Sequence, residues 1–313
     1  MTAGSVERSG GWDNVKCLIT GASGFIGRHL CQRLCAEGSE VHATSRQQRP
    51  TTAGRGPVWW QADMAELSDA RRILTAIRPD IVFHLSGFVG ANPDPALVTK
   101  TYESQLTSTV NALIASTEAG CRRIIQTGSL TEPGPGEAQP TPRSPYTAAK
   151  WAAGAYGRMF HKLYGTPVVI LRPSMVYGPG QDSGKLIPYV IRSLLRGESP
   201  RLSSGQLRAD WIYVADVIDG FLRAAAASGI DGKTVDLGTG VIVSVRDIVE
   251  RLVDITCSTI EPMFGVVPDR SGEAEMDANI TAAFELIGWR AATPLETGLR
   301  RAVEWFRTSS PPD

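Results

Sequence analysis

Residues 18–27 read Leu18-Ile19-Thr20-Gly21-Ala22-Ser23-Gly24-Phe25-Ile26-Gly27, and this stretch decides the fold. Leu18 and Ile19 end a short apolar run, as a buried parallel strand does. A helical pattern opens directly behind the three glycines. Glycine lets the backbone approach a pyrophosphate closely, and a helix N-terminus offers free N–H groups with partial positive charge. The stretch therefore predicts a dinucleotide-binding turn, with a purely structural turn as the alternative.

The residue after the second strand indicates which dinucleotide such a turn binds. The pattern predicts a helix over 25–36 and a strand over 40–44. In dinucleotide folds an acidic residue at this place binds the ribose hydroxyls, whereas an arginine accommodates a 2′-phosphate. The chain reads Ser45-Arg46, with Arg49 close behind and no acid nearby. Because a guanidinium suits a phosphate, the sequence favours NADP(H), with NAD(H) as the alternative; the other reading of Arg46 is an exposed loop residue.

Strand and helix patterns then alternate along the chain. Short apolar runs predict further strands at 58–61, 81–85 and 123–127. Helices are expected from Asp63, over 96–118 and over 147–163, and His84 is expected to be a core residue within its strand. This alternation predicts an α/β fold, a doubly wound parallel (Rossmann) sheet with a smaller mixed α/β substrate-binding domain.

The chain divides into three expected parts. Residues 1–13 are rich in Gly and Ser and are expected to form a disordered tail. Residues 14–177 are expected to form the nucleotide-binding domain. Residues 178–313 are expected to form mainly the substrate domain, with some strands returning to the main sheet.

Composition gives no support to several kinds of partner. With 32 basic and 32 acidic residues the formal net charge is zero, so neither nucleic acid nor an anionic membrane is favoured. The five cysteines show no metal-ligand or disulfide spacing, and no metal site is expected. The chain shows no secretory leader and no long apolar run, so we expect a cytoplasmic protein.

A second group of chemistry-bearing residues lies at 129–150. Ser129 follows the fifth strand, and a loop rich in proline and glycine leads to Tyr146. Tyr146 and Lys150 are four residues apart and hence on one helical face. An ammonium beside a phenol favours the phenolate and should lower the pKa of the tyrosine. The alternative is an ordinary solvent-facing pair.

These motifs together resemble the extended short-chain dehydrogenase/reductases, in the branch of nucleotide-sugar epimerases, dehydratases and ketoreductases. The resemblance covers nearly the whole chain, because it continues into the second half. The further matching motifs are Leu171-Arg172-Pro173, Val176-Tyr177-Gly178-Pro179, Asp210-Trp211-Ile212-Tyr213-Val214 and Gly288-Trp289.

The resemblance implies a role for each matching position. Tyr146 would be the general acid/base, Lys150 would bind the nicotinamide ribose and depress the pKa of Tyr146, and Ser129 would hydrogen-bond the substrate oxygen. The residues expected around the dinucleotide are Gly21, Ser23, Gly24, Phe25, Ile26, Gly27, Ser45, Arg46, Asp63, Met64, Leu85, Ser86, Gly87, Gln105, Thr127, Tyr146, Lys150, Pro173, Met175 and Val176. The residues expected around a nucleotide-diphosphate sugar are Ser129, Ser174, Gln181, Lys185, Arg208 and Arg270, the last four with an exposed surface role as the alternative. Relatives commonly pair their two long helices, so a homodimer is expected through 96–118 and 147–163.

Departures from the family pattern separate its branches. Sugar dehydratases carry an Asp-Glu pair after the serine position, where this chain has Leu130 and Thr131, and Glu132 lies one residue too late. Ala209 stands where the family usually has arginine, with Arg208 beside it, and Gln105 stands where relatives often have asparagine.

The sequence thus favours an NADPH-dependent ketoreductase acting on a nucleotide-linked keto-deoxysugar, such as a 4-keto-6-deoxyhexose. An NAD-dependent 4-epimerase is the alternative. It is less favoured, because an enzyme that retains NAD normally has an acidic residue that binds the ribose, and this residue is missing here. A dehydratase or a non-catalytic NADP-binding regulator is less favoured. A regulator would have no need of Ser129, Tyr146 and Lys150 together.

Overall fold

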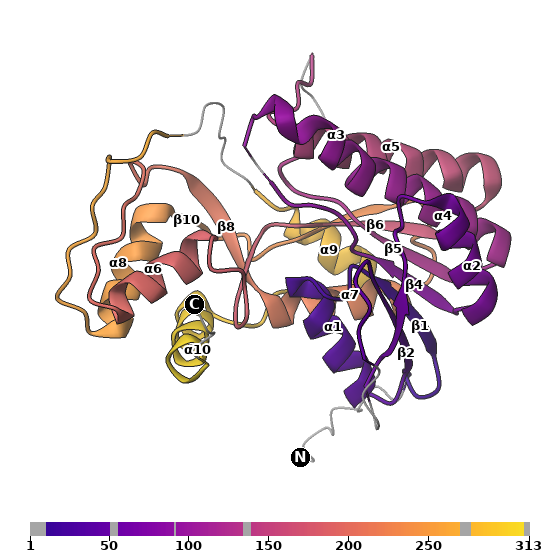
Figure 1. Cartoon of the computed structure of the whole chain (residues 1–313), viewed down its shortest axis with the longest axis horizontal. Helices are drawn as coiled ribbons and strands as arrows, with labels where there is room; N and C mark the ends of the chain where they lie inside the picture. Colours follow the sequence, from indigo (N-terminus) through magenta and orange to yellow (C-terminus); the bar gives the residue numbers. More distant parts are fainter. Residues whose placement is uncertain (1–10, 51–55, 91, 134–138, 270–276, 310–313) are drawn as a thin grey trace.

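The computed structural model describes residues 11–50, 56–90, 92–133, 139–269 and 277–309 (Figure 1). A larger part holds the first half of the chain, with a sheet between two layers of helices. A smaller part holds α6 (Leu186–Leu195), α8 (Val245–Thr256) and α10 (Leu295–Thr308), and lies to one side of the larger part.

The larger part is built on a seven-stranded sheet in the order β3-β2-β1-β4-β5-β6-β9. Every neighbouring pair in this sheet is parallel. The strands are β1 (Lys16–Thr20), β2 (Glu40–Ser45), β3 (Val58–Gln61), β4 (Ile81–His84), β5 (Arg123–Thr127), β6 (Val168–Pro173) and β9 (Thr234–Leu237). The predicted doubly wound parallel sheet is confirmed, and the carboxyl ends of its strands meet at one edge.

Helices cover both faces of this sheet. Side chains alternate along a strand, so Cys17 and Ile19 of β1 pack on one face while Leu18 packs on the other. The helices of the first face are α1 (Phe25–Ala36), α7 (Val214–Ala226) and α9 (Ile280–Ile287); those of the second are α2 (Leu67–Ile77), α4 (Ser108–Ala119) and α5 (Pro145–Tyr164).

The helix after β3 and the long helix after β4 differ from their predictions. Asp63 does not start a helix, because its carboxylate accepts the N–H of Ala65 in a turn and α2 begins at Leu67. The segment expected as one helix over 96–118 is divided into four pieces. They are η1 (Pro95–Leu97), α3 (Val98–Thr101), a π-helical stretch η2 (Tyr102–Thr107) and α4.

The first described residues differ from the predicted tail. Trp12 was expected in the disordered tail, but it is buried in the core of the first helical face. Its ring lies 6.3 Å from that of Phe83 in β4. The tail prediction is therefore wrong at this residue, and residues 1–10 lie outside the described part of the chain.

The smaller part has its own sheet and core. Its strands are β7 (Met175–Tyr177), β8 (Arg208–Tyr213) and β10 (Ile242–Ser244), in the order β10-β8-β7. Tyr177, Trp211 and Phe306 belong to a hydrophobic core that these strands share with α6, α8 and α10. β7 lies in this sheet although its residues were assigned to the first domain, whereas β9, α7 and α9 return to the larger part.

Helix α1 contacts the segment that leads into the smaller part. Arg28 donates to the carbonyl oxygen of Gly180 at 2.7 Å, and Nε2 of His29 lies 2.9 Å from that of Pro179. No helix among the described residues is long and apolar enough to cross a membrane.

Candidate active site

The glycine turn joins β1 to α1 in a geometry that only small residues allow. Gly21 has a φ of +67°, and a Cβ there would lie 2.7 Å from the backbone of Leu85. A Cβ on Gly27 would collide with the carbonyl oxygen of Gly21. α1 begins after Gly24, and no side chain among the described residues caps its first turn. These N–H groups fit an anionic ligand such as a dinucleotide diphosphate.

The turn after β4 packs against this glycine turn. Leu85 donates its N–H to the carbonyl oxygen of Thr20 at 3.2 Å, and Ser86 donates to the Thr20 hydroxyl at 3.3 Å. Gln105 of η2 donates to the carbonyl oxygen of Phe88 at 2.9 Å and is itself buried. Its Oε1 has no partner among the described residues. Gly87, in a left-handed conformation, packs against this amide.

The turn after β2 is exposed. The Ser45 hydroxyl accepts the N–H of Gln47 at 3.2 Å, and the Arg46 carbonyl oxygen accepts from Gln61 at 3.2 Å. The Arg46 guanidinium makes no ion pair with any residue that the structure describes. The Arg49 guanidinium lies over the Trp59 ring, 5.2 Å from its centre.

Asn111, which no sequence motif singled out, holds the turn after β3. Its Nδ2 donates to the carbonyl oxygens of Met64 and Ala65, at 3.1 and 2.8 Å. This fixes the two residues that follow Asp63, which is one of the residues expected around the dinucleotide. A polar side chain on the buried face of a predicted helix was the only available signal.

Tyr146 and Lys150 both lie on α5, whose start is tightly specified. Ser144 caps the helix through a capping box with Thr147, and Pro145 occupies its first position. The Ser144 hydroxyl accepts the Thr147 N–H at 3.2 Å. Tyr146 is thereby held in the first turn. One turn later, the Lys150 ammonium is buried and donates to the carbonyl oxygen of Thr127 at 2.6 Å.

The protonation of this pair differs from the sequence prediction. Burial raises the pKa of Tyr146 to about 12, with a smaller rise from the Glu132 charge, while hydrogen bonding to the Ser129 side chain lowers it. Burial lowers the pKa of Lys150 to about 8, against the opposite influence of Glu132. The expected lowering of the tyrosine pKa is therefore wrong for the protein alone. Desolvation of the phenol is the largest cause, and the Lys150 ammonium is bonded to Thr127.

His84 is a core residue, as predicted. Its Nδ1 lies 2.9 Å from the Thr20 hydroxyl oxygen and its Nε2 lies 3.1 Å from that of Thr109. Burial and the nearby Lys150 charge lower the pKa of His84 to about 3. The ring is therefore neutral at physiological pH and connects β1, β4 and α4.

Ser129 lies in a compact turn directly after β5. Its hydroxyl oxygen lies 2.8 Å from that of Thr131 and accepts the Thr131 N–H at 3.2 Å. Its own N–H donates to the Glu132 carboxylate at 2.6 Å. Ser129 thus comes close to Tyr146 with a hydroxyl that is already oriented by the turn.

The expected substrate residues are spread over the junction of the two parts. Ser174 lies between β6 and β7 and is 3.4 Å from a carboxylate oxygen of Asp210. Gln181 donates to the carbonyl oxygen of Val176 at 2.8 Å. Lys185 precedes α6 and Arg208 begins β8, both exposed. Arg270 lies outside the described residues.

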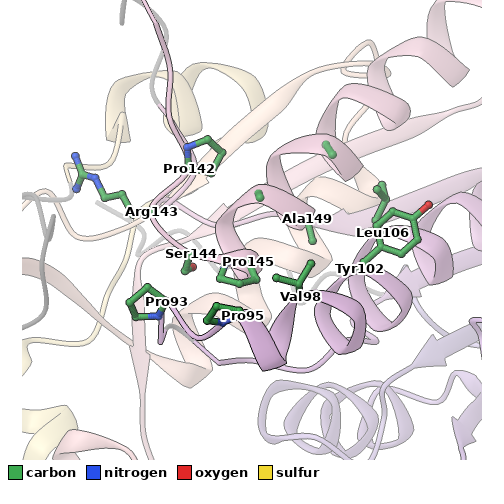
Figure 2. A pocket seen from close by; sticks show the side chains of 12 residues that line it. Pro93, Pro95, Val98, Tyr102, Leu106, Pro142, Arg143, Ser144, Pro145 and Ala149 are labelled. Atoms are coloured by element: carbon green, nitrogen blue, oxygen red, sulfur yellow. The ribbon is translucent and has the colours of Figure 1, made fainter.

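A cavity of about 600 Å³ lies on the outer face of α3, η2 and α5, away from these groups (Figure 2). Pro93, Pro95, Val98, Tyr102 and Pro145 are among its lining side chains. Ser129, Tyr146 and Lys150 do not line it. No cluster that could hold a metal ion occurs among the residues that the structure describes.

The parallel sheet, its glycine turn and the serine, tyrosine and lysine beside it define an extended short-chain dehydrogenase/reductase. Residues 17–238 match the NAD dependent epimerase/dehydratase family, and the chain belongs to that family.

Relatives from two branches match almost the entire chain. A UDP-glucose 4-epimerase from Mycolicibacterium smegmatis is 30% identical, over 95% of this chain and 100% of the relative. A dTDP-D-glucose 4,6-dehydratase from Mus musculus is 26% identical, over 96% of this chain and 92% of the relative. The solved structure of MoeE5 with UDP-glucuronic acid and NAD is 29% identical, with a TM-score of 0.84 over 94% of this chain and 99% of that one.

Proposed function

We propose that the protein is an NADPH-dependent ketoreductase that acts on a nucleotide-diphosphate-linked keto-deoxysugar, such as a 4-keto-6-deoxyhexose. The observation that carries this proposal is the end of β2. An exposed Arg46 stands there without an ion-pair partner among the described residues. A guanidinium at this place accommodates a 2′-phosphate, whereas an acid would bind the ribose hydroxyls of NAD.

The protein would hold the dinucleotide along the carboxyl edge of the sheet. The first-turn N–H groups of α1 would hold the diphosphate, Arg46 would hold the 2′-phosphate, and Lys150 would hold the nicotinamide ribose. Bound NADPH supplies a hydride to the ketone carbon. The remaining contacts are those expected from Asp63, Met64, Leu85, Ser86, Gly87, Gln105, Thr127, Pro173, Met175 and Val176.

The protein's own contribution to reduction is a proton and a hydrogen bond. Tyr146 gives its phenolic proton to the developing alkoxide, and the Ser129 hydroxyl donates a hydrogen bond to the same oxygen. The pKa of Tyr146, raised to about 12, keeps the phenol protonated at neutral pH.

Dehydration receives less support. Leu130 and Thr131 occupy the places of the acid–base pair, and neither side chain carries a carboxyl group. The Glu132 carboxylate is buried and accepts the N–H of Ser129, so it is engaged with the protein backbone.

The substrate would lie between the two parts of the molecule. Ser174 stands at the junction, beside Asp210, and Gln181 follows β7. Lys185 and Arg208 add positive charge on the smaller part, which suits a diphosphate.

The second candidate is an NAD-dependent nucleotide-sugar 4-epimerase. It is favoured by the full-length similarity to a UDP-glucose 4-epimerase and by the MoeE5 structure with NAD.

One set of assays separates the two functions. Purified protein is mixed with nucleotide 4-keto-6-deoxysugars and either NADPH or NADH, and loss of the reduced-nicotinamide absorbance is followed. The proposal expects turnover with NADPH well above that with NADH. Interconversion of UDP-glucose and UDP-galactose without added cofactor, or NAD retained through purification, would replace it by the epimerase.

We further propose a homodimer that pairs the face bearing the Figure 2 cavity with its counterpart. Val98 and Tyr102 expose about half of their surface there, at 51% and 56%. A charge at Tyr102 (Tyr102→Glu) should shift the molecular mass measured by light scattering from dimer to monomer. An unchanged mass would remove this face from the interface.

A cytoplasmic location is proposed as well, supported by five cysteines that are all free thiols.

A further inference from the structure

We propose that Glu132 is a positioning residue, which holds the turn that presents the Ser129 hydroxyl to the substrate oxygen. This rests on the function proposed above only in the role it gives Ser129. In the sequence, Glu132 lies one residue beyond the positions of the dehydratase acid–base pair.

The contacts between the two residues are reciprocal. The Ser129 N–H donates to Oε1 of Glu132 at 2.6 Å, and the Glu132 N–H donates to the Ser129 carbonyl oxygen at 3.2 Å. A hydrogen bond to an ionised carboxylate is stronger than a neutral one. One residue therefore closes the turn on both sides of the serine, through its carboxylate at the Ser129 N–H and through its own backbone N–H at the Ser129 carbonyl oxygen.

The carboxylate lies in a niche made by two glycines. Glu132 is 8% exposed. A Cβ on Gly128 would lie 2.7 Å from Oε1, and a Cβ on Gly154 of α5 would lie 3.6 Å from Oε2. A larger residue at Gly128 would displace the carboxylate. The space for the Glu132 side chain therefore depends on a glycine directly after β5 and on a second glycine in α5.

The niche is also electrostatically matched to an anion. Burial raises the pKa of Glu132, whereas Lys150, Arg172 and Arg158 each oppose that rise. Arg172 is itself fixed by Asp236 at 2.7 Å. A buried carboxylate requires such compensation to stay ionised. The same charge raises the pKa of Lys150.

The effect of Glu132 on the reaction passes through Ser129. The Ser129 hydroxyl is oriented by Thr131 within the same turn and interacts with Tyr146. If the carboxylate is removed, the Ser129 N–H loses its acceptor and the turn loses its closure. The hydroxyl then samples positions away from the substrate oxygen, at a cost to the rate of the chemical step.

A double-mutant cycle tests this route. Glu132→Ala should lower kcat by about 10- to 100-fold with little change in KM, the loss of a charge-assisted hydrogen bond near the reacting atoms. In a Ser129→Ala background the same substitution should change kcat by less than about 3-fold. Equal losses in both backgrounds would overturn the proposal, because a general structural defect acts whether or not the serine is present.

Two further variants separate positioning from folding. Glu132→Gln keeps an acceptor oxygen for the Ser129 N–H and should retain most of the activity that Glu132→Ala loses. Equal loss in both would overturn the proposal. Asp80→Ala is the control, because Asp80 accepts the Lys16 N–H at 2.8 Å at the amino end of the sheet. It should leave kcat unchanged.

A readout without turnover keeps this test independent of the proposed reaction. In protein labelled with ¹⁵N, the Ser129 amide proton should resonate downfield and move upfield in Glu132→Gln. An unmoved resonance would overturn the proposal. If the wild type reduces no keto-sugar but epimerises a UDP-sugar, the proposed function fails, and the cycle is run on epimerisation, in which Ser129 contacts the same oxygen.

Discussion

Two turns at the carboxyl edge of the same sheet differ in their hydrogen bonding and in their exposure. The turn after β5, residues 128–132, is closed by hydrogen bonds of Ser129 with Thr131 and Glu132. The turn after β2, residues 46–49, is exposed, and the Arg46 guanidinium has no ion pair among the described residues. The turn after β5 is held by its own hydrogen bonds, whereas the turn after β2 carries an exposed positive charge that an anionic ligand could contact.

This difference separates the contributions to rate and to binding. A group that must act in the transition state is best held in advance, because reorganising it would cost rate. A group that recognises a charged ligand needs only to be within reach. We therefore expect substitutions near β5 to change turnover and substitutions near β2 to change cofactor affinity.

The largest effect is expected at Tyr146. Tyr146→Phe removes the proton donor and should lower kcat by about 10²- to 10⁴-fold, the usual range for general acid catalysis. The affinity for NADPH, measured by fluorescence titration, should stay nearly unchanged. Tyr177→Phe is a matched control, since the hydroxyl of this buried tyrosine donates to the carbonyl oxygen of Leu295 at 3.2 Å within the smaller part. Full activity in Tyr146→Phe would remove the residue from the mechanism.

The next effect is expected at Arg46. Arg46→Ala should weaken NADPH binding by about 10- to 100-fold, since hydrogen bonds to charged groups are worth more than neutral ones. NADH binding should change little, because NADH carries no 2′-phosphate. Arg49→Ala is the control, because the Arg49 guanidinium lies over Trp59. An equal loss for both cofactors in Arg46→Ala would refute the 2′-phosphate role and favour the epimerase.

Much of the fold follows from local patterns. The limits of β3 and β5 match the predicted runs at 58–61 and 123–127. β5 is buried along almost its whole length, as a central parallel strand is. The π-helical η2 could not be predicted, since it depends on packing of Gln105 under the turn after β4. Trp12 was missed because its partner, Phe83, is distant in sequence.

The candidate site was predicted as a set of residues but not as an electrostatic arrangement. Spacing alone put Tyr146 and Lys150 on one helical face. It could not show that burial raises the pKa of the phenol, or that Lys150 bonds to the backbone of β5. The contact of Glu132 with the Ser129 N–H was equally hidden, because a backbone donor is the same in every residue except proline and carries no sequence signal.

The free energy of unfolding should depend on pH through the buried Lys150. The pKa of Lys150 is about 8 in the folded protein, below its ordinary value of 10.5, so the unfolded chain binds more protons between these values. The Lys150 contribution to the free energy of unfolding therefore rises with pH across that window. Above pH 10 Tyr146 acts oppositely, because its folded pKa is raised. In denaturant titrations from pH 8 to 10, the free energy of unfolding of the wild type should rise relative to that of Lys150→Met.

The baseline for that comparison is Lys162→Met, at an exposed position near the end of α5. The difference between this variant and the wild type should stay constant over the same range. A constant difference for Lys150→Met as well would show that the ammonium is not desolvated in the folded protein.

The smallest effect is expected where the protein holds the turn after β3. Asn111→Ala leaves the carbonyl oxygens of Met64 and Ala65 without their donor and should lower the free energy of unfolding by about 1–3 kcal/mol. The freed turn carries Asp63, so NADPH and NADH should both bind more weakly, by a similar factor. That equal loss is the opposite of the selective loss expected for Arg46→Ala. A selective loss of NADPH binding in Asn111→Ala would mean that 2′-phosphate recognition extends beyond the turn after β2.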